Sequence, residues 1–573
     1  MDSQTTHSPT LAKSSATSNR EATAQSDAVF TKYANATLPK RSALTAGLEA
    51  YAGTWDARHA SHLLRRTLFG YTASDLAKAK SLTAATCVDA LLDSVDEVIA
   101  PPVSVDALKE TVPIGQTWVT AAYDGTITNV RGRSLQAWWM NLMVNQKFSI
   151  REKMVLFWHN QLPTEIDAVG DPRLSYLQNV LQRKFALGNF RDLVKEITLD
   201  SAMLRYLNGN TNTNKNPNEN FGRELQELFT IGKGPEISAG NYTNYTEDDV
   251  KAAARVMTGW VDVRLTMESV FVEKNHDVTD KVFSDAYGGK IIKGRAGVDG
   301  ALEVDDLLDM IFAQAETARY LCRKLYRFFV YYAIDAQVET NVIGPMAAML
   351  QANGYEVKPV IAALLKSAHF HDVLNLGCMI KNPLDHVVGT FRQLEMTRPD
   401  GVDPVKSYAF LNVLVTEASR MQMEIGRPPN VAGWAAYYQN PVFYELWINS
   451  DTLPRRVQLT DILSSAKGYV YYSADKNATN LDPIALAKLS TKPGTITTLI
   501  SDLADLFYPI TLTDLQLAYL KRVMLDTLPD YEWAAEWDPY LATPADLKLR
   551  SAVENRLRAL FVAMMQLAEY QLC

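Results

Sequence analysis

Apolar residues recur every three to four positions over most of the chain. The pattern is clearest in VDDLLDMIFAQAETARYLCRKLYRFFVYYA (304–333) and in the final DLKLRSAVENRLRALFVAMMQLAEYQLC (546–573). This spacing places the apolar side chains on one face of a helix, which predicts amphipathic helices that pack on a shared core. The sequence has no repeat of fixed length, which disfavours a solenoid. The pattern therefore predicts a mainly α protein.

The periodicity changes between residues 261 and 293. The runs VDVRLTMESVFVEKN and KVFSDAYGGKIIKG are rich in β-branched and aromatic residues, and Gly288 and Gly289 offer a turn in the second run. Runs of this kind, bounded by turn residues, are typical of short strands. We expect a small β-hairpin insertion here, of one or two hairpins, within a large single α-helical domain.

The N-terminal segment differs in composition from the rest of the chain. MDSQTTHSPTLAKSSATSNREATAQSD is rich in Ser, Thr and Ala and contains no apolar run. Such a segment cannot bury enough surface to offset the entropy of ordering it. We predict a disordered segment over residues 1–48 and a single α-rich domain over residues 49–573. The segment also lacks the apolar stretch of a signal peptide, so the chain is either cytoplasmic or an exported protein whose signal is absent from this sequence.

The composition, with 47% hydrophobic and 21% charged residues, is that of a globular protein. The formal net charge of −8 argues against a dedicated nucleic-acid-binding protein, which usually carries a basic surface. The sequence has no run of about 18 apolar residues, so we expect no transmembrane segment. The cysteines Cys87, Cys322, Cys378 and Cys573 lie far apart, which leaves both long-range disulfides and free buried thiols open.

The densest polar stretch is PNENFGRELQELFTIG, residues 217–232. A helix over this stretch would present an apolar stripe and a polar stripe. The apolar stripe consists of Phe221, Leu225 and Leu228. The polar stripe consists of Asn220, Glu224 and Glu227. With Arg223 spaced to pair with Glu219 and Glu227, the stretch fits carboxylates held for acid/base chemistry or for a hard cation, and equally a solvated face with ordinary ion pairs.

Two further segments combine residue types that are common in functional sites. FWHNQLPTE places His159 and Asn160 at the end of an apolar helix, and NHDVTDK places His276, Asp277 and Lys281 on a loop. A histidine there can serve as a base or a metal ligand, and loops on a rigid scaffold often carry function. Structural roles explain both segments as well, because an imidazolium interacts favourably with a helix C-terminus and Asn and Asp side chains close loops.

These motifs occur in a characteristic order. HLLRRTLFGYTASDL is followed by REKMVLFWHNQLPTE, LGNFRDLVKEITLDSAMLRYLNG, NPNENFGRELQELFTIGKG and YTEDDVKAAARVMTGW, and then by HDVTDK, KNPLDHVVGTFRQL, RPPNVAGW and AEYQLC. In this combination, from about residue 55 to residue 573, the sequence resembles the large bacterial family called domain of unknown function 1800. The most characteristic segments of that family correspond to the three polar segments described above.

The resemblance implies an uncharacterised and mostly exported type of protein, so we expect an extracytoplasmic location, periplasmic or secreted. It also implies a partner protein similar to sulfatases and alkaline phosphatases, and joint action on a charged or polysaccharide-like substrate. The segment KNPLDHVV departs from the family pattern near Asp385, and we therefore assign no site to residues 381–386.

We expect the three polar segments to meet in one site. The expected catalytic residues are His159, Glu224, Glu227 and Arg223. The expected substrate-binding residues are Asn160, Asn220, Lys281 and Trp158. The candidate ligands of a divalent metal ion are His159, His276, Asp277 and Glu219.

On this hypothesis the chain is a hydrolase that acts on a polar or polysaccharide-like substrate, with or without a divalent metal ion. Glu224 or Glu227 would act as the base, or would bind the metal ion together with His159, while Arg223 and Lys281 bind an anionic group. The alternative is a non-catalytic surface or assembly protein, in which the same residues form a closed structural network and each is satisfied by another.

Overall fold

The computed structural model describes residues 44–93, 98–399 and 401–573. Residues 44–573 form one compact unit. The predicted disordered segment over residues 1–48 lies, up to residue 43, outside the described residues. The described chain is mainly helical, which confirms the prediction from the hydrophobic periodicity.

Helices occur along both halves of the chain, with long connections before α5, α13 and α20. The first half contains α2 (Ala57–Thr67), α3 (Ala73–Lys80), α4 (Ala84–Leu92), α5 (Thr128–Val144), α6 (Arg151–Gln161), α7 (Ile166–Val169), α8 (Pro172–Lys184), α9 (Phe190–Thr198), α10 (Ser201–Tyr206), α11 (Glu219–Glu224) and α12 (Glu247–Val256). The second half contains α13 (Glu303–Phe312), α14 (Ala315–Phe329), α15 (Ala336–Val338), α16 (Gly344–Ala352), α17 (Val357–Leu365), α18 (Pro383–Gln393), α19 (Pro404–Arg420), α20 (Thr452–Ser464), α21 (Pro483–Ala487), α22 (Ile496–Phe507), α23 (Asp514–Leu525), α24 (Tyr531–Ala542) and α25 (Leu547–Gln566).

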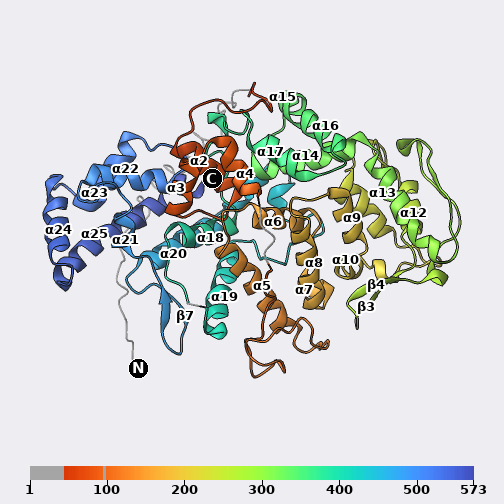
Figure 1. Cartoon of the computed structure of the whole chain (residues 1–573), viewed down its shortest axis with the longest axis horizontal. Helices are drawn as coiled ribbons and strands as arrows, with labels where there is room; N and C mark the ends of the chain where they lie inside the picture. The colour runs from red at the N-terminus through yellow and green to blue at the C-terminus, as the bar shows by residue number, and fades with distance from the viewer. Residues whose placement is uncertain (1–43, 94–97, 400) are drawn as a thin grey trace, which may run out of the picture. The chain divides into compact units, whose positions relative to one another are not determined.

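Helices from distant parts of the chain lie in the middle of this unit. Figure 1 shows α22 to α25 on the left, α9, α12 and α13 on the right, and α2, α6 and α18 between them. The apolar faces of these helices bury a continuous hydrophobic core that runs from α2 to the last residues of the chain. In α14, for example, Leu321, Leu325 and Phe329 are fully buried at the spacing of one helix face.

The strands of the described residues form four separate two-stranded antiparallel sheets. They are β1 (Glu236–Ser238) with β2 (Asn241–Tyr242), β3 (Trp260–Val263) with β4 (Glu268–Phe271), β5 (Lys281–Val282) with β6 (Ile291–Ile292), and β7 (Tyr469–Tyr472) with β8 (Asn477–Thr479). The second and third sheets confirm the predicted hairpin insertion, with Gly288 and Gly289 both at φ +65° between β5 and β6. The hairpins β1–β2 and β7–β8 are not predicted by the pattern, because their strands are too short to show alternation.

The structure shows the state of the cysteines and the lengths of the helices. Cys87, Cys322, Cys378 and Cys573 are all free thiols, and three of them are buried. Burial raises the pKa of the Cys87 thiol to about 12, which keeps it unreactive at neutral pH. Within the described part of the chain, no helix combines the length and the apolar character that a membrane crossing requires.

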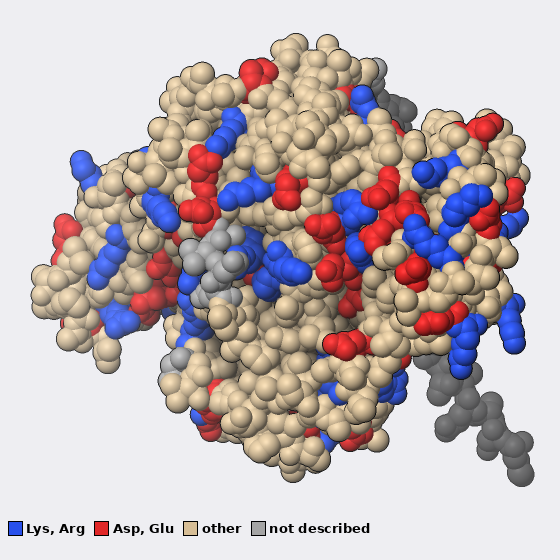
Figure 2. All heavy atoms as spheres, turned by 45° about the vertical axis from the view of Figure 1, so that its right-hand side comes forward, with Lys and Arg blue, Asp and Glu red and all other residues tan. Residues whose placement is uncertain are grey.

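Acidic and basic side chains mix on the surface. Figure 2 shows them interspersed on one face of the molecule, without a large area of a single sign on that face. Several belong to ion pairs that join elements far apart in sequence, such as Arg191 of α9 with Asp309 of α13, 2.5 Å apart. Pairs exposed to this degree contribute little to stability, so the buried core holds the helices together.

The backbones of the segment after α2 and of α18 touch directly. Gly70 lies in this segment with φ +69°, and a Cβ atom at this position would lie 2.4 Å from the Cα atom of Gly389 in α18. No real Cβ atom approaches a backbone atom so closely. Glycine at Gly70 therefore meets two requirements, a left-handed backbone and close contact with α18.

We expect the substitution Gly70→Ala to lower the free energy of unfolding more than Gly354→Ala does. Both glycines have positive φ, but a Cβ atom at Gly354 would meet nothing within 4 Å. The cost of placing alanine at a positive φ is shared by both variants and cancels in the comparison. The clash at Gly70 then lowers the free energy of unfolding by a further amount of about 1–3 kcal/mol. Denaturant unfolding of the two variants measures the difference, and equal losses of stability would contradict the close approach of α2 and α18.

Candidate functional site

The polar stretch over residues 217–232 is not one regular α-helix. Asn218 caps α11, with its side-chain oxygen accepting a hydrogen bond from the backbone N–H of Asn220 at 3.0 Å. The helix then widens into a π-helix over Leu225–Thr230. Gly232 follows it with φ +75°. A π-helical turn inside an α-helix is rare and is frequently found at functional sites.

The wider turn moves the apolar stripe by one residue. Phe221, Leu225 and Phe229 are buried in the core, whereas Leu228 is half-buried. Leu228, the expected third member of the stripe, packs on the core but is only partly buried, and Phe229 is the residue that is fully buried there. Gln226 is fully buried, and its Oε1 accepts a hydrogen bond from the hydroxyl of Tyr287 at 2.9 Å.

The two glutamates of this stretch have different surroundings. The carboxylate of Glu227 accepts a hydrogen bond from the hydroxyl of Tyr245 at 2.7 Å and pairs with the ammonium of Lys233 at 2.7 Å. The Glu224 carboxyl makes no hydrogen bond or ion pair with any residue in the described part of the chain. Burial, and then the neighbouring Glu227, raise the pKa of Glu224 to about 7. Glu227 is thus paired, and Glu224 is available to hold a proton.

One face of α14 lies beside this carboxylate pair. Tyr320, Lys324 and Arg327 follow one another at the spacing of a single helix face, and the hydroxyl of Tyr320 donates to the carbonyl of Leu228 at 3.0 Å. Burial, and then Arg327, lower the pKa of Lys324 to about 8. Its ammonium lies 5.2 Å from the centre of the Tyr320 ring. A lysine and a carboxyl group with pKa values near neutrality thus lie on adjacent elements.

Arg223 is held by a neighbouring helix. Its guanidinium binds both carboxylate oxygens of Glu247 in α12, at 2.5 and 2.7 Å, and lies 3.9 Å from Glu219. The side chains of Glu219 and Asn220 are exposed. The expected catalytic arginine therefore ties α11 to α12 through a bidentate ion pair.

Trp158 and Asn160 are used inside the fold. Trp158 is fully buried, its Nε1–H donates to the carbonyl of Ala186 at 3.1 Å, and its ring stacks on Phe190. The side-chain oxygen of Asn160 accepts a hydrogen bond from the backbone N–H of Trp434 at 3.0 Å. Both expected substrate-binding residues therefore hold neighbouring segments in place.

His159 faces a closed cavity of about 20 Å³ between α5, α6 and α8. Its Nε2 has no hydrogen-bond partner in the described structure, and the same holds for Ser175 Oγ and Asn179 Nδ2 in the lining of the cavity. Burial lowers the pKa of His159 to about 4. The imidazole is therefore neutral at physiological pH, and the cavity has room and polar partners for an ordered water.

The third segment forms a buried ion-pair cluster. Lys281 and Glu303 are fully buried with their charged atoms 2.5 Å apart, and His276 Nε2 lies 3.1 Å from the same carboxylate. Although burial raises it, hydrogen bonds from Arg255 and Thr279 hold the pKa of Asp277 well below its usual range. Lys281, expected to bind substrate, is instead the buried partner of Glu303.

The described residues contain no group of three or more His, Cys, Asp or Glu side chains placed to hold a metal ion. Glu219 is exposed, Asp277 pairs with Arg255, His276 lies against Glu303, and His159 faces its own cavity. The expected metal ligands therefore do not fit a metal centre, and we assign no chemical step to a metal ion.

The three polar segments are joined by contacts but do not share one centre. Gln161, two residues after His159, donates from Nε2 to the carbonyl of Leu228 at 2.8 Å. Helix α12 connects the other two segments, because its Glu247 binds Arg223 and its Arg255 binds Asp277. Among the expected catalytic residues, Glu224 is partly exposed, and its carboxyl group has no hydrogen-bond or ion-pair partner among the described residues.

A family model described as a protein of unknown function (DUF1800) matches residues 62–572. The chain belongs to this family. A search among curated proteins and a search among solved structures each found no match. The match covers α2 through α25 and so includes all three polar segments of this DUF1800 protein.

Sequence reasoning missed the groups that surround the carboxylate pair. Lys233 and Tyr245 hold Glu227, and Tyr320, whose hydroxyl binds the carbonyl of Leu228, comes from α14, far along the chain. One signal for α14 is present in this DUF1800 sequence, since Tyr320, Lys324 and Arg327 repeat at helical spacing within an amphipathic helix. Sequence spacing alone does not show which glutamate they face.

We expect the substitution Lys281→Met to destabilise the protein by about 3–5 kcal/mol, because it leaves the buried Glu303 carboxylate without its partner. The matched control is Lys293→Met, which removes an exposed pair with Asp280 and should change stability little. Denaturant unfolding measures both. Equal effects of the two substitutions would show that Lys281 is not buried with Glu303.

We expect His159 to make the folded state sensitive to acid. Its pKa is about 4 in the fold against 6.5 for the unfolded chain, so the unfolded state binds more protons between these values and stability is lost as pH falls from 6.5 to 4. The loss attributable to this residue is about 3 kcal/mol. The variant His159→Phe should lose correspondingly less stability over that range, and identical pH profiles of unfolding would contradict a buried neutral imidazole.

Proposed function

We propose that this protein is a hydrolase that cleaves a polar or polysaccharide-like substrate by acid/base catalysis at the π-helix. One observation carries the proposal: of two glutamates three residues apart, Glu227 is bound by Lys233 and Tyr245, whereas Glu224 is unpaired, half-buried and has a pKa of about 7. Two neighbouring carboxyl groups in different surroundings, one of which holds its proton to near neutral pH, are the usual arrangement of an acid and a base.

In this mechanism Glu224 is the acid and Glu227 is the ionised partner. Glu224 donates its proton to the leaving oxygen as the bond to the electrophilic carbon breaks. Glu227 accepts a proton from the water whose oxygen forms the new bond to that carbon. The products carry the hydrogen and the hydroxyl of one water molecule, and a proton passes from Glu227 back to Glu224 through solvent.

The face of α14 supplies groups for the rest of the substrate. Lys324 carries no ion pair in the described structure, and its pKa of about 8 leaves it mostly protonated at neutral pH. It can bind an anionic or hydroxyl-rich part of a substrate beside Tyr320, whose ring offers a surface for a sugar. An extracytoplasmic location and a partner similar to sulfatases and alkaline phosphatases complete the proposal, and both rest on the family resemblance.

A second candidate function is a non-catalytic surface or assembly protein. It is favoured by the number of expected site residues that the fold itself uses, because Arg223, Asp277 and Lys281 are each bound to a carboxylate or guanidinium of a neighbouring element. Under this alternative Glu224 has no catalytic role, and its substitution leaves every measurable property except local stability unchanged.

We expect the wild-type protein to hydrolyse at least one member of a panel of nitrophenyl glycosides and nitrophenyl esters, with a rate that falls above pH 7 as Glu224 loses its proton. The variant Glu224→Gln should lower kcat/KM by about 10²–10⁴-fold. The control Asp248→Asn changes an exposed carboxylate of the nearby helix α12 and should keep full activity. Absence of turnover by the wild type, or equal rates in Glu224→Gln, would favour the assembly protein.

A further inference from the structure

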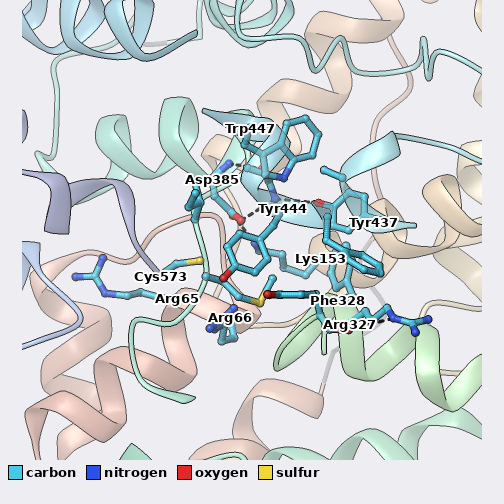
Figure 3. Close-up of a pocket in the computed structure, with 16 residues that line it drawn as sticks. Arg65, Arg66, Lys153, Arg327, Phe328, Asp385, Tyr437, Tyr444, Trp447 and Cys573 are labelled. Carbon is cyan, nitrogen blue, oxygen red and sulfur yellow. Dashed lines mark hydrogen bonds and ion pairs between the residues drawn. The ribbon is translucent and has the colours of Figure 1, made fainter. Parts of the chain in front are cut away.

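A second cavity lies where three distant parts of the chain meet. Arg65 and Arg66 of α2, Lys153 of α6, and Asn382 and Asp385 at the start of α18 contribute to its wall. We call it the cationic cavity. Its volume of about 20 Å³ exceeds what one ordered water needs. Figure 3 shows Arg66, Lys153 and Asp385 around it, while the guanidinium groups of Arg65 and Arg327 extend away on opposite sides.

Asp385 is the carboxylate side chain in the wall of this cavity, and it already has partners. It pairs with the ammonium of Lys153, and it accepts a hydrogen bond from Asn382 Nδ2 at 2.8 Å. Lys153 also lies over the ring of Phe69, 4.5 Å from its centre. The positive charge of Lys153 is therefore balanced within the protein.

Arg66 forms no ion pair among the described residues, although the Asp385 carboxylate interacts with it electrostatically. Its side chain is 4% exposed, and its Nε has no hydrogen-bond partner in the described structure. One terminal nitrogen makes two long contacts, to the carbonyl of Asn375 at 3.5 Å and to Cys378 Sγ at 3.4 Å. None of these partners is negatively charged. A guanidinium has five N–H groups in a planar fork, so most of its donors remain available toward the cavity.

Further buried basic side chains lie next to the wall of the cavity, since Lys381 stands between the lining residues Ile380 and Asn382 in the chain. Lys381 is 5% exposed with its ammonium 3.9 Å from the centre of the Tyr570 ring, and Arg456 is fully buried and donates to the carbonyl of Lys381 at 2.9 Å. Burial, and then Arg65, hold the pKa of Lys381 well below its usual range, against the opposing effect of negative charge at Cys573 and Asp385. The uncharged amine of Lys381 is therefore favoured in this region shielded from water, and a bound anion would favour its charged form.

We propose that the cationic cavity binds a small oxyanion, a phosphate, sulfate or carboxylate group, through the guanidinium of Arg66, and that the bound anion keeps the nearby amine of Lys381 protonated. Guanidinium groups bind such anions through two parallel hydrogen bonds. The anion is either a free ion or the charged group of a larger molecule. This inference does not depend on the proposed hydrolysis at Glu224, because it rests on other residues and other helices.

The test is calorimetric titration of the full chain with inorganic phosphate and with sulfate, at fixed ionic strength maintained with sodium chloride. We expect saturable binding of one anion per chain, together with a rise in melting temperature that follows the anion concentration. The variants Arg66→Met and Lys381→Met should each weaken binding at least tenfold. The control Arg550→Met removes an exposed guanidinium of α25 and should bind as the wild type does.

Stability of the variants in anion-free buffer provides an independent readout. Neither Arg66 nor Lys381 has a carboxylate partner in the described structure, so removal of either charge leaves no anion unpaired, and both variants should fold with stability equal to or above that of the wild type. Lys381→Met breaks no side-chain hydrogen bond in the described structure. If Arg66→Met does not fold, the anion affinity of Lys381→Met decides the test. Anion binding that is absent from the wild type, or unchanged in both variants, would overturn the proposal.

A comparison of two probes distinguishes the sources of the anion. Tighter binding of inorganic phosphate than of glucose 6-phosphate identifies a closed site for a free ion. Equal or tighter binding of glucose 6-phosphate identifies a site that is open to the charged group of a larger molecule. Both results support an oxyanion site, whereas failure of both probes to bind contradicts it.

Discussion

The ion pair between Glu227 and Lys233, completed by the hydroxyl of Tyr245, decides the chemistry available at the π-helix. It gives one carboxylate two partners, an ammonium and a hydroxyl. Burial, and then the neighbouring Glu227, raise the pKa of Glu224 to about 7, so Glu224 keeps its proton up to about that pH. The two glutamates therefore differ in two ways, because Glu227 is bound by Lys233 and Tyr245 whereas Glu224 is partly buried without a partner among the described residues.

Much of the fold can be predicted from the sequence, because its helices carry local signals. The Thr246–Asp249 spacing predicts the capping box that opens α12, and both reciprocal hydrogen bonds are present. The β-branched runs after Val261 predict the hairpins β3–β4 and β5–β6. The π-helix is not predictable in this way, because the apolar stripe is read with α-helical spacing. In the structure Phe229 is fully buried, whereas the expected Leu228 is only partly buried.

The candidate site is harder to predict from the sequence, because the burial of its side chains depends on partners that are distant in sequence. Lys281 resembles a loop cation that could meet a substrate, yet Glu303 neutralises it inside the core. Asp385 lies in a segment to which the sequence assigns no site, yet it pairs with Lys153 of α6. In both cases the residue type indicates a charge, but only the fold shows whether that charge is paired. Glu224 and Arg66 differ from these residues because neither forms an ion pair with another described residue.

The account therefore depends on the protonation of a single carboxyl group, which can be observed without knowledge of the substrate. Carbon-13 NMR of protein labelled at the glutamate side-chain carboxyl follows the titration of each glutamate directly. The account predicts one resonance with a midpoint near pH 7 that is absent from the Glu224→Gln variant. If every glutamate titrates near its ordinary pKa, below about pH 5, Glu224 is ionised at neutral pH and the proposed acid does not exist.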